Sequence, residues 1–389
     1  MKQFKNLLLC VWLMILIAAC VGNPGSEETP GGDTDEILTL NVSATYIINN
    51  GTDAALFTVL KGKKDVTADA RIYQKKGNSF EQLPGTSFSS TKQGTYSFFA
   101  SYNGEMSEDI TVTVTSGLLE LPEDPNPEQF NGFKHRILAL QGTSLGCTYC
   151  PMMIAGLTEY TQLEESESTV LVAAHGVMDG DEMISDYSNA VLKSSGISSK
   201  GVPALLFNLR SNREILSVMA SDTPAKVASR IQATAKPLLA TPAYTGISAA
   251  VSGTESSGSI KVTAGIKVGQ TGKYRVCAWV VEDDIYATGQ MNGYPTLEDS
   301  YDFTRHSNVL RCISSMSPIT GTNLGGKDEC QAGEEQMFFH EFMLSDMEIK
   351  RLSNVRVVII VTHNESGSSY TVDNVVSCAL NQQVKYEYQ

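Results

Sequence analysis

The spacing of hydrophobic residues changes twice along the chain. From residue 37 to residue 116, apolar and polar side chains alternate, as in Leu38, Leu40 and Val42. This period of two is typical of β-strands with one buried face. Turn signals such as Asn50-Gly51 and Asn103-Gly104 separate the runs. We therefore expect residues 37–116 to form a small β-sandwich.

Residues 134–240 instead show buried strands alternating with amphipathic helices. Thr223 and Pro224 begin one of these helices, as N-cap and first helical residue. The predicted order, β-α-β-α-β-β-α, indicates an α/β domain. The expected strands are residues 135–141, 169–175, 204–209 and 215–219, and the expected helices are residues 147–163, 184–195 and a third from residue 224.

The remaining segments are a linker and a second β-rich region. Residues 117–133 contain Pro122, Pro125 and Pro127, too many prolines for a helix or a central strand. Residues 241–389 return to short apolar runs, and we expect a second, larger β-sandwich there. Its expected strands are residues 260–268, 274–281, 309–314, 337–344, 355–362 and 370–376.

The first 19 residues have the composition of a secretory signal. Lys2 and Lys5 precede an apolar run, residues 7–19, that is too short to cross a bilayer as a helix. The stretch that ends at Cys20 resembles a bacterial lipobox. This resemblance implies cleavage before Cys20, acylation of that cysteine and a polar tether over residues 20–36. An ordinary signal peptide with a chance cysteine is the alternative.

Charge limits the kinds of partner. The formal net charge is -14, and removal of residues 1–19 leaves 27 basic and 43 acidic residues, a net charge of -16. An acidic surface repels phosphate backbones, so we expect no nucleic-acid partner. The expected partners are the membrane, through lipid on Cys20, and an exported protein or surface ligand that the sequence does not identify.

Six cysteines remain after Cys10 leaves with the signal and Cys20 takes the lipid. An even number in an exported chain suits disulfide bonds. The last four allow three pairings, of which we expect Cys312 with Cys330, closing a polar loop, and Cys277 with Cys378, joining strands. The disulfide candidates are Cys147, Cys150, Cys277, Cys312, Cys330 and Cys378.

The stretch GCTYCPMMIAGL, residues 146–157, is the main candidate for chemistry. Cys147 is expected where a helix begins, so the helix dipole favours its thiolate. Cys150, one turn later, is placed to resolve a mixed disulfide. Zinc is not expected, because only His175 offers a third ligand. His175 ends a predicted strand. It is either a catalytic partner of Cys147 or simply a polar residue at the strand end.

Residues 134–238 resemble the thioredoxin fold. The resemblance is carried by two motifs together, the Cys-x-x-Cys motif after the first expected strand and Val202-Pro203 before the third. The resemblance implies a cis peptide bond at Pro203, with its loop against the active cysteines. Thr148 and Tyr149 replace the Gly-Pro of typical thioredoxins. Gln141 stands where many thioredoxins carry an acid. These departures put the redox potential and rate of the site in question.

Two further resemblances extend beyond the thioredoxin-like region. The run GTYSFFASYNG, residues 94–104, is similar to late strands of bacterial immunoglobulin-like domains. Residues 280–286 and 302–311, with the lipobox and Cys-x-x-Cys-Pro, resemble an outer-membrane lipoprotein family of Bacteroides-like bacteria, named for a twenty-eight-kilodalton protein. That resemblance spans residues 134–389. It implies architecture and an outer-membrane location, on the periplasmic or the cell-surface face.

Two functions remain open from the sequence. One is a lipid-anchored thiol-disulfide oxidoreductase that uses Cys147, Cys150, Pro203 and His175. The other is a surface binding or adhesion lipoprotein in which the thioredoxin-like domain is a scaffold and Cys147-Cys150 a permanent disulfide. Neither requires a cofactor. The acidic run Glu282, Asp283 and Asp284 lacks the ligand spacing of a calcium loop.

Overall fold

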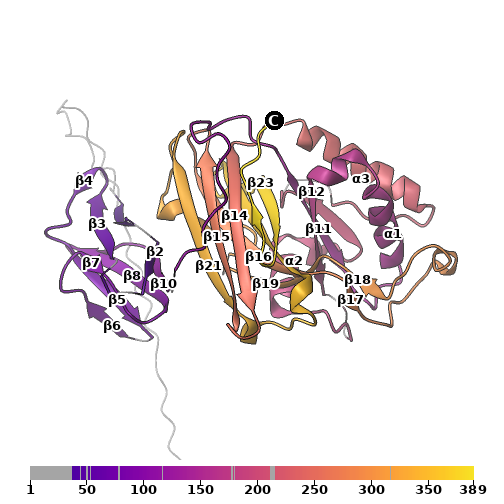
Figure 1. Cartoon of the computed structure of the whole chain (residues 1–389), viewed down its shortest axis with the longest axis horizontal. Helices are drawn as coiled ribbons and strands as arrows, with labels where there is room; N and C mark the ends of the chain where they lie inside the picture. Colours follow the sequence, from indigo (N-terminus) through magenta and orange to yellow (C-terminus); the bar gives the residue numbers. More distant parts are fainter. Residues whose placement is uncertain are drawn as a thin grey trace, which may run out of the picture. The chain divides into compact units, whose positions relative to one another are not determined.

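The computed structural model describes residues 37–389, apart from residues 44, 50, 53, 78, 116, 177, 179, 211–214 and 316. The expected signal peptide, Cys20 and the tether lie outside the described residues. Residues 38–389 form one compact unit. It is mostly β-sheet arranged in several sheets, with three α-helices among the described residues (Figure 1). None of these helices has the length and apolar character needed to cross a bilayer.

The N-terminal strands form two sheets around one apolar core. Strands β1, β3 and β4 make one sheet, with β7 paired to β3, and the second has the order β2-β10-β8-β5-β6, with β9 paired to β8. The strands are β1 (Leu38–Val42), β2 (Tyr46–Ile48), β3 (Ala55–Lys61), β4 (Lys64–Asp65), β5 (Arg71–Lys76), β6 (Ser79–Gln82), β7 (Ser87–Phe88), β8 (Gly94–Tyr102), β9 (Glu105–Met106) and β10 (Ile110–Thr115).

The alternation predicted for this region is confirmed by burial. Leu38 and Leu40 of β1 face the same core as Phe98 of β8, and Phe57 of β3 packs its ring 4.9 Å from that of Phe98. The turn between β8 and β9 takes positive φ at Asn103 and Gly104. Such φ values suit the tight turn that Asn-Gly favours between antiparallel strands.

The largest sheet joins strands from both sides of residue 240. Its order is β13-β11-β12-β19-β16-β22-β23, with β20 paired to β16. Because one sheet contains strands from both regions, the domain boundary expected at residue 240 remains a prediction. The strands are β11 (Ile137–Thr143), β12 (Thr169–His175), β13 (Ala204–Phe207), β16 (Tyr274–Glu282), β19 (Val309–Ile313), β20 (Thr322–Asn323), β22 (Val355–Ser366) and β23 (Ser369–Ala379).

Pairing within this sheet sets the position of the cysteine loop. Strands β11 and β12 are parallel over their full length, ending with Thr143 opposite His175. Strand β13 is antiparallel to β11, with Ala204 opposite Gly142. The strand expected at residues 215–219 is reduced, in its described part, to a single bridge between Leu216 and Leu205.

Helices cover both faces of the β11–β12 end of the sheet. Helices α1 (Cys150–Tyr160) and α3 (Pro224–Leu239) share a core with Ile137 and Ala139 of β11. Helix α2 (Asp186–Ser194) packs on the other face, with Leu138 and Leu140. Because both faces are covered, β11 is buried at every position, as is usual for parallel strands.

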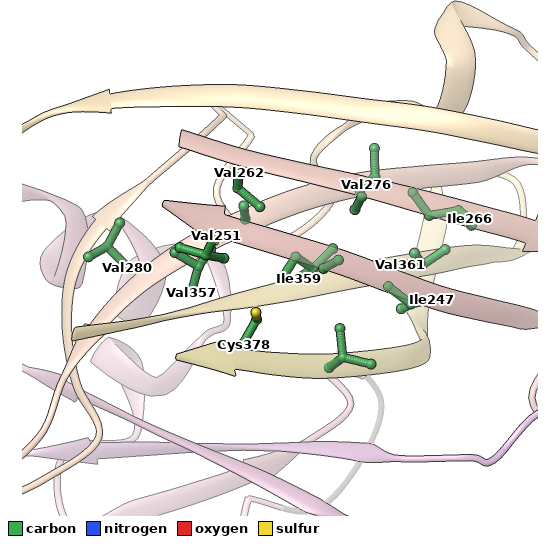
Figure 2. Close-up of a cluster of buried hydrophobic side chains, with 14 of the residues drawn as sticks. Ile247, Val251, Val262, Ile266, Val276, Val280, Val357, Ile359, Val361 and Cys378 are labelled. Carbon is green, nitrogen blue, oxygen red and sulfur yellow. The ribbon is translucent and has the colours of Figure 1, made fainter. Parts of the chain in front are cut away.

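A four-stranded sheet, β21-β15-β14-β24, packs against the β16–β22–β23 end of the large sheet. Figure 2 shows the core between them, with Val262 and Ile266 of β15 near Val276, Ile359 and Val361. The sequence did not predict β14, since its run TGISAAVSGT is dominated by small residues. The strands are β14 (Thr245–Thr254), β15 (Ser259–Val268), β21 (Glu335–Met343) and β24 (Gln383–Val384).

The proline-rich linker is bound to β15 by one buried lysine. Lys267, only 1% exposed, forms an ion pair with Asp124 at 2.5 Å. Its ammonium group also donates to the carbonyl oxygens of Asn126, Pro127 and Gln129 at 3.1, 2.6 and 3.2 Å. A run too rich in proline for regular structure is therefore held by polar contacts to a side chain far along the chain.

The two disulfides expected in residues 241–389 are wrong, because all four cysteines are buried thiols. Cys312 stands opposite Val280 of β16 and Cys330 opposite Gly272, eight positions apart. At roughly 3.3 Å per residue this is about 26 Å, far beyond the reach of a disulfide.

The second pair, Cys277 and Cys378, fails for a different reason. Cys277 faces the core that contains α2, whereas Cys378 faces the core between the two sheets. Side chains on opposite faces of a sheet cannot join, so both thiols serve as small apolar core residues. Burial raises the pKa of Cys277 to about 12 and that of Cys378 to about 11.

Candidate functional site: the Cys147-Cys150 disulfide and its cover

Cys147 and Cys150 are joined by a disulfide between the end of β11 and the start of α1, with Cα atoms 5.4 Å apart. Helix α1 begins at Cys150, so the expected start at Cys147 is three residues too early. Cys147 lies in the preceding turn, where its carbonyl accepts a hydrogen bond from the Cys150 amide at 3.3 Å. Pro151 occupies the first helical turn, where an N–H is not required. Cys150 is thus the cysteine at the helix N-terminus.

Both cysteines are buried although the loop between them reaches the surface. Cys147 is 2% exposed and Cys150 is fully buried, while Tyr149 is 56% exposed. Solvent and large reagents therefore meet Tyr149 before they meet either sulfur.

The backbone around the disulfide is covered by residues 287–301, here called the cover segment. It lies between the short strands β17 (Ile285–Tyr286) and β18 (Arg305–His306) and contains the 3-10 turn Pro295–Leu297. The Gln290 side chain donates from Nε2 to the carbonyl oxygens of Leu145 and Cys147, both at 3.1 Å. The amide of Met291 donates to Leu145 O at 2.7 Å.

Two further contacts fasten the cover segment. The Gly293 amide donates to the carbonyl oxygen of Thr148, between the two cysteines, at 2.8 Å. The Tyr301 hydroxyl donates to Glu159 of α1 at 2.5 Å. Burial and this hydrogen bond raise the pKa of Tyr301 to about 12, so the phenol keeps its proton at neutral pH. Sequence reasoning missed this cover, because no local spacing links residues 287–301 to residues 144–150.

Pro203 lies at the same end of the sheet as the cysteine loop. The Val202-Pro203 peptide bond is cis, which confirms the expectation from the thioredoxin resemblance. Pro203 precedes Ala204, the partner of Gly142, so it lies beside the end of β11. Its carbonyl accepts a hydrogen bond from Ser217 Oγ at 2.8 Å.

His175 is tied to the cysteine loop through Asp181. The imidazole Nδ1 donates to Asp181 Oδ2 at 2.8 Å, and both side chains are buried. The same carboxylate oxygen accepts from the Leu145 amide at 2.8 Å, two residues before Cys147. Burial alone would raise the pKa of Asp181, but hydrogen bonds from His175 and backbone amides outweigh it and lower the pKa. The carboxylate is therefore charged at neutral pH.

His306 is a second histidine that sequence reasoning left without a role. Its ring meets that of His175 edge to face, with centroids 5.9 Å apart. Burial, and then the neighbouring His175, lower the pKa of His306, which is neutral at pH 7. Neither its spacing from His175 nor that of Asp181 signals this cluster, because β18 reaches it from more than 100 residues away.

The acidic run that ends β16 is held by arginines. Glu282 is buried against Arg311 at 2.8 Å, and Asp283 accepts from Arg356 at 2.9 Å. Asp284 pairs with Arg305 at 3.2 Å. Over the described part of the chain, no three His, Cys, Asp or Glu side chains gather as metal ligands.

Fold and site together define a β-rich, multi-sheet protein with a covered Cys-x-x-Cys disulfide at the N-terminus of a helix. No family model matches the chain, and no curated protein matches it. Among solved structures, it is similar to HBP35 of Porphyromonas gingivalis, with 18% identity and a TM-score of 0.50 over 64% of this chain and 76% of that one. At this identity the likeness shows the fold alone.

A domain of the outer membrane lipoprotein Omp28 from Porphyromonas gingivalis is also similar in part. The match has 20% identity and a TM-score of 0.22, and it covers 36% of this chain and 89% of that one. At this TM-score the match is too weak to support a conclusion.

Proposed function

We propose that this chain is an outer-membrane lipoprotein whose thioredoxin-like domain, residues 134–240, exchanges disulfides with exported proteins. The observation that carries the proposal is the Cys147-Cys150 disulfide at the start of α1, with Pro203 beside the end of the preceding strand. The order β11-α1-β12-α2-β13-α3, with β13 antiparallel to β11, also supports the thioredoxin-like assignment.

The reaction requires a partner dithiol as the reductant. A partner thiolate attacks Cys147 Sγ, the Cys147–Cys150 bond breaks, and Cys150 leaves as a thiolate. The second partner thiolate then attacks the mixed disulfide and releases Cys147. The partner leaves as a disulfide, two electrons have passed to the cysteine pair, and the two site thiolates take up the two protons that the partner thiols lost.

Exchange requires movement of the cover segment. At 2% exposure, Cys147 cannot meet a partner thiolate along the line of its disulfide bond. The contacts that hold the cover segment near it are hydrogen bonds to backbone carbonyls, each worth about 1 kcal/mol net. Local opening at that cost is within the range of native-state fluctuations.

The anchor is part of the same proposal. The lipobox-like end of the signal, at Cys20, supports acylation there, and residues 37–116 act as an immunoglobulin-like spacer between the lipid and the rest of the chain. Replacing Cys20 with Ser is expected to move the exported chain from the membrane fraction to the soluble fraction. Protease added to intact cells then distinguishes the surface face from the periplasmic face. Retention of the Cys20→Ser chain in the membrane fraction would contradict the anchor.

A non-enzymatic surface binding or adhesion lipoprotein is the second candidate. The burial of both sulfurs favours it, because an inert disulfide that braces the α1 turn needs no access. The reduction potential of the Cys147-Cys150 pair separates the two functions. Structural disulfides lie below about -300 mV, whereas exchange-active pairs lie roughly between -270 and -120 mV.

Trapping provides the direct test. In a Cys150→Ala chain the Cys147 thiolate attacks a partner disulfide, the reverse of the reaction above, and the mixed disulfide persists because Cys150 is not there to displace the partner. The matched control carries Cys147→Ala and Cys150→Ala, and it retains the four buried thiols. Adducts with exported proteins in the single variant alone would support exchange. No adducts together with a potential below about -300 mV would exclude it.

A further inference from the structure

A cavity lies next to the His175 cluster, between α1, strands β11 and β12, and residues 302–308. Its volume is about 230 Å³. This is far more than the roughly 30 Å³ that one water molecule occupies, and just under the range of about 300–1,000 Å³ typical of ligand sites. We call it the α1 pocket and define it by Gln141, Thr143, Leu157, His175, Phe303 and His306.

One side of the α1 pocket carries buried polar atoms without a protein partner. Gln141 Nε2, Thr143 Oγ1 and His306 Nε2 form no hydrogen bond with any described residue. The three side chains are 8%, 2% and 6% exposed. A buried polar group left unpaired is costly, and such groups are rare in native proteins. Three around one cavity indicate a site that receives its partners from a bound molecule.

The chemistry of each atom restricts that molecule. The Gln141 amide nitrogen only donates hydrogen bonds, and the Thr143 hydroxyl either donates or accepts. The backbone of Ala287 favours a proton on the His306 ring. We assign that proton to Nδ1, because Nε2 has no partner among the described residues, and in this neutral tautomer Nε2 accepts. The bound group must offer an acceptor to Gln141 and a donor to His306.

The rest of the lining combines the apolar residues Ile154, Leu157 and Phe303 with two exposed charged residues, Asp302 and Arg305. The Asp302 carboxylate accepts from the amide and the hydroxyl of Thr304 at 2.8 and 2.7 Å. Arg305, at the rim, is exposed and pairs with Asp284, so it supplies no free buried charge. The carboxylate of Asp181 is already paired with His175. An anion would have no buried counter-charge here, and a purely apolar molecule would leave the three polar atoms unpaired.

We propose that the α1 pocket binds a small neutral amide, a carboxamide carried on a single apolar ring. The carbonyl oxygen accepts from Gln141 Nε2 and from the Thr143 hydroxyl, the amide nitrogen donates to His306 Nε2, and the ring lies against Leu157 and Phe303. This site is separate from the disulfide, and the proposal does not depend on thiol exchange.

Three probes of nearly the same shape test the proposal: benzamide, benzoate and toluene. Titration of each into the purified full-length chain, followed by ligand-observed NMR at pH 7, gives their relative affinities. Benzamide is expected to bind saturably, in the millimolar range or tighter. Benzoate lacks the donor for His306 and carries a charge, and toluene lacks both polar groups. Each is expected to bind at least about tenfold more weakly, a factor that corresponds to about 1.4 kcal/mol.

Two substitutions locate the binding, and a third serves as their control. Thr143→Val and His306→Phe each remove one polar atom at nearly constant shape, and each is expected to weaken benzamide at least tenfold. The Thr143→Val chain should melt at the same temperature as the wild-type chain or higher, because it loses a buried hydroxyl without a partner. Thr158→Val is the control. Thr158 lines the pocket, but its hydroxyl already donates to Ile154 O at 3.0 Å, so affinity should not change.

The outcomes are distinct. Saturable benzamide binding that Thr143→Val and His306→Phe each weaken at least tenfold, and that Thr158→Val leaves intact, supports the proposal, whereas unchanged affinity in the first two variants would overturn it. Equal affinity for toluene or benzoate would overturn it, since the polar side of the pocket would then play no part. Absence of saturable benzamide binding in a folded wild-type chain would show that the pocket holds water only.

Discussion

Gln290 Nε2 lies 3.1 Å from the carbonyl oxygen of Cys147, although 143 residues separate the two along the chain. The same nitrogen donates to Ser144 O and Leu145 O at 3.3 and 3.1 Å. One amide group therefore holds the cover segment against three carbonyls of the turn that contains the disulfide.

Replacing Gln290 with Leu is expected to speed reduction of the disulfide. The Gln290 amide has two N–H donors, each worth about 1 kcal/mol net as a hydrogen bond, so the variant loses about 2 kcal/mol and the cover segment opens roughly 30 times more often. The rate of reduction by dithiothreitol measures this opening. Gln331→Leu, a change at an exposed glutamine on another loop, is the control. Equal rates in the wild type and Gln290→Leu would show that the cover segment does not control access.

Cysteine counting tests the corrected disulfide pattern. When the chain is unfolded without reductant and alkylated, Cys277, Cys312, Cys330 and Cys378 should all react, and Cys147 and Cys150 should not. In the folded chain the same four thiols should be protected, because burial excludes the reagent and raises the pKa of each. Mass spectrometry of the peptides reads both results. A disulfide-linked peptide containing Cys312 or Cys378 would contradict the structure.

Lys267→Met should release the linker. The change leaves the partly exposed Asp124 carboxylate without its counter-charge and removes the hydrogen bonds to three linker carbonyls, which should cost about 2–3 kcal/mol of folding free energy. Urea unfolding measures the loss, and limited proteolysis should show new cleavage within residues 117–133. Lys273→Met, at an exposed lysine nearby on the chain, should change neither. Unchanged proteolysis in Lys267→Met would mean that the other contacts of the linker suffice.

Asp373 should give the stability a measurable pH dependence. Burial raises the pKa of its carboxyl from 3.8 to about 6, even though Thr245 donates to it from both its amide and its hydroxyl. Between these values the folded chain keeps a proton that the unfolded chain has lost. The free energy of unfolding therefore falls as pH rises from about 4 to 6, by about 3 kcal/mol from this group.

The Asp373→Asn variant isolates that contribution. Its amide does not titrate, so the variant should lack the Asp373 contribution, and the free energy of unfolding of the wild type minus that of the variant should fall by about 3 kcal/mol between pH 4 and pH 6. The difference is the relevant quantity, because burial lowers the pKa of His340 to about 4 and gives the opposite slope over nearly the same range. Urea unfolding at pH 4, 5 and 6 measures it. Parallel curves for the two chains would place the Asp373 pKa near its ordinary value.

Local patterns predicted much of the fold. The strand at residues 169–175 and the start of α3, with Thr223 capping and Pro224 first in the helix, depend on neighbouring residues alone and were confirmed. Strand β14 was missed since its core positions include Ala249 and Ala250, whose small side chains give little periodic signal.

The site was only partly predictable, because several of its contacts join residues far apart in the sequence. Spacing identified Cys147, Cys150, Pro203 and His175, which lie near one end of the sheet. It did not identify Gln290, Asp181 or His306, whose contacts depend on long-range packing. The burial of Cys147 follows from the cover segment, and therefore from the same long-range packing.

Strands β12 and β19 are parallel and pair at a single position, Ala173 opposite Val309. Cutting the chain at residue 240 removes β19 and leaves β12 with an unprotected edge, which invites pairing between molecules. The same cut removes the cover segment. An isolated 134–240 fragment is thus expected to react faster with thiols and to aggregate more readily than the intact chain, so its reactivity would misrepresent that of the whole protein.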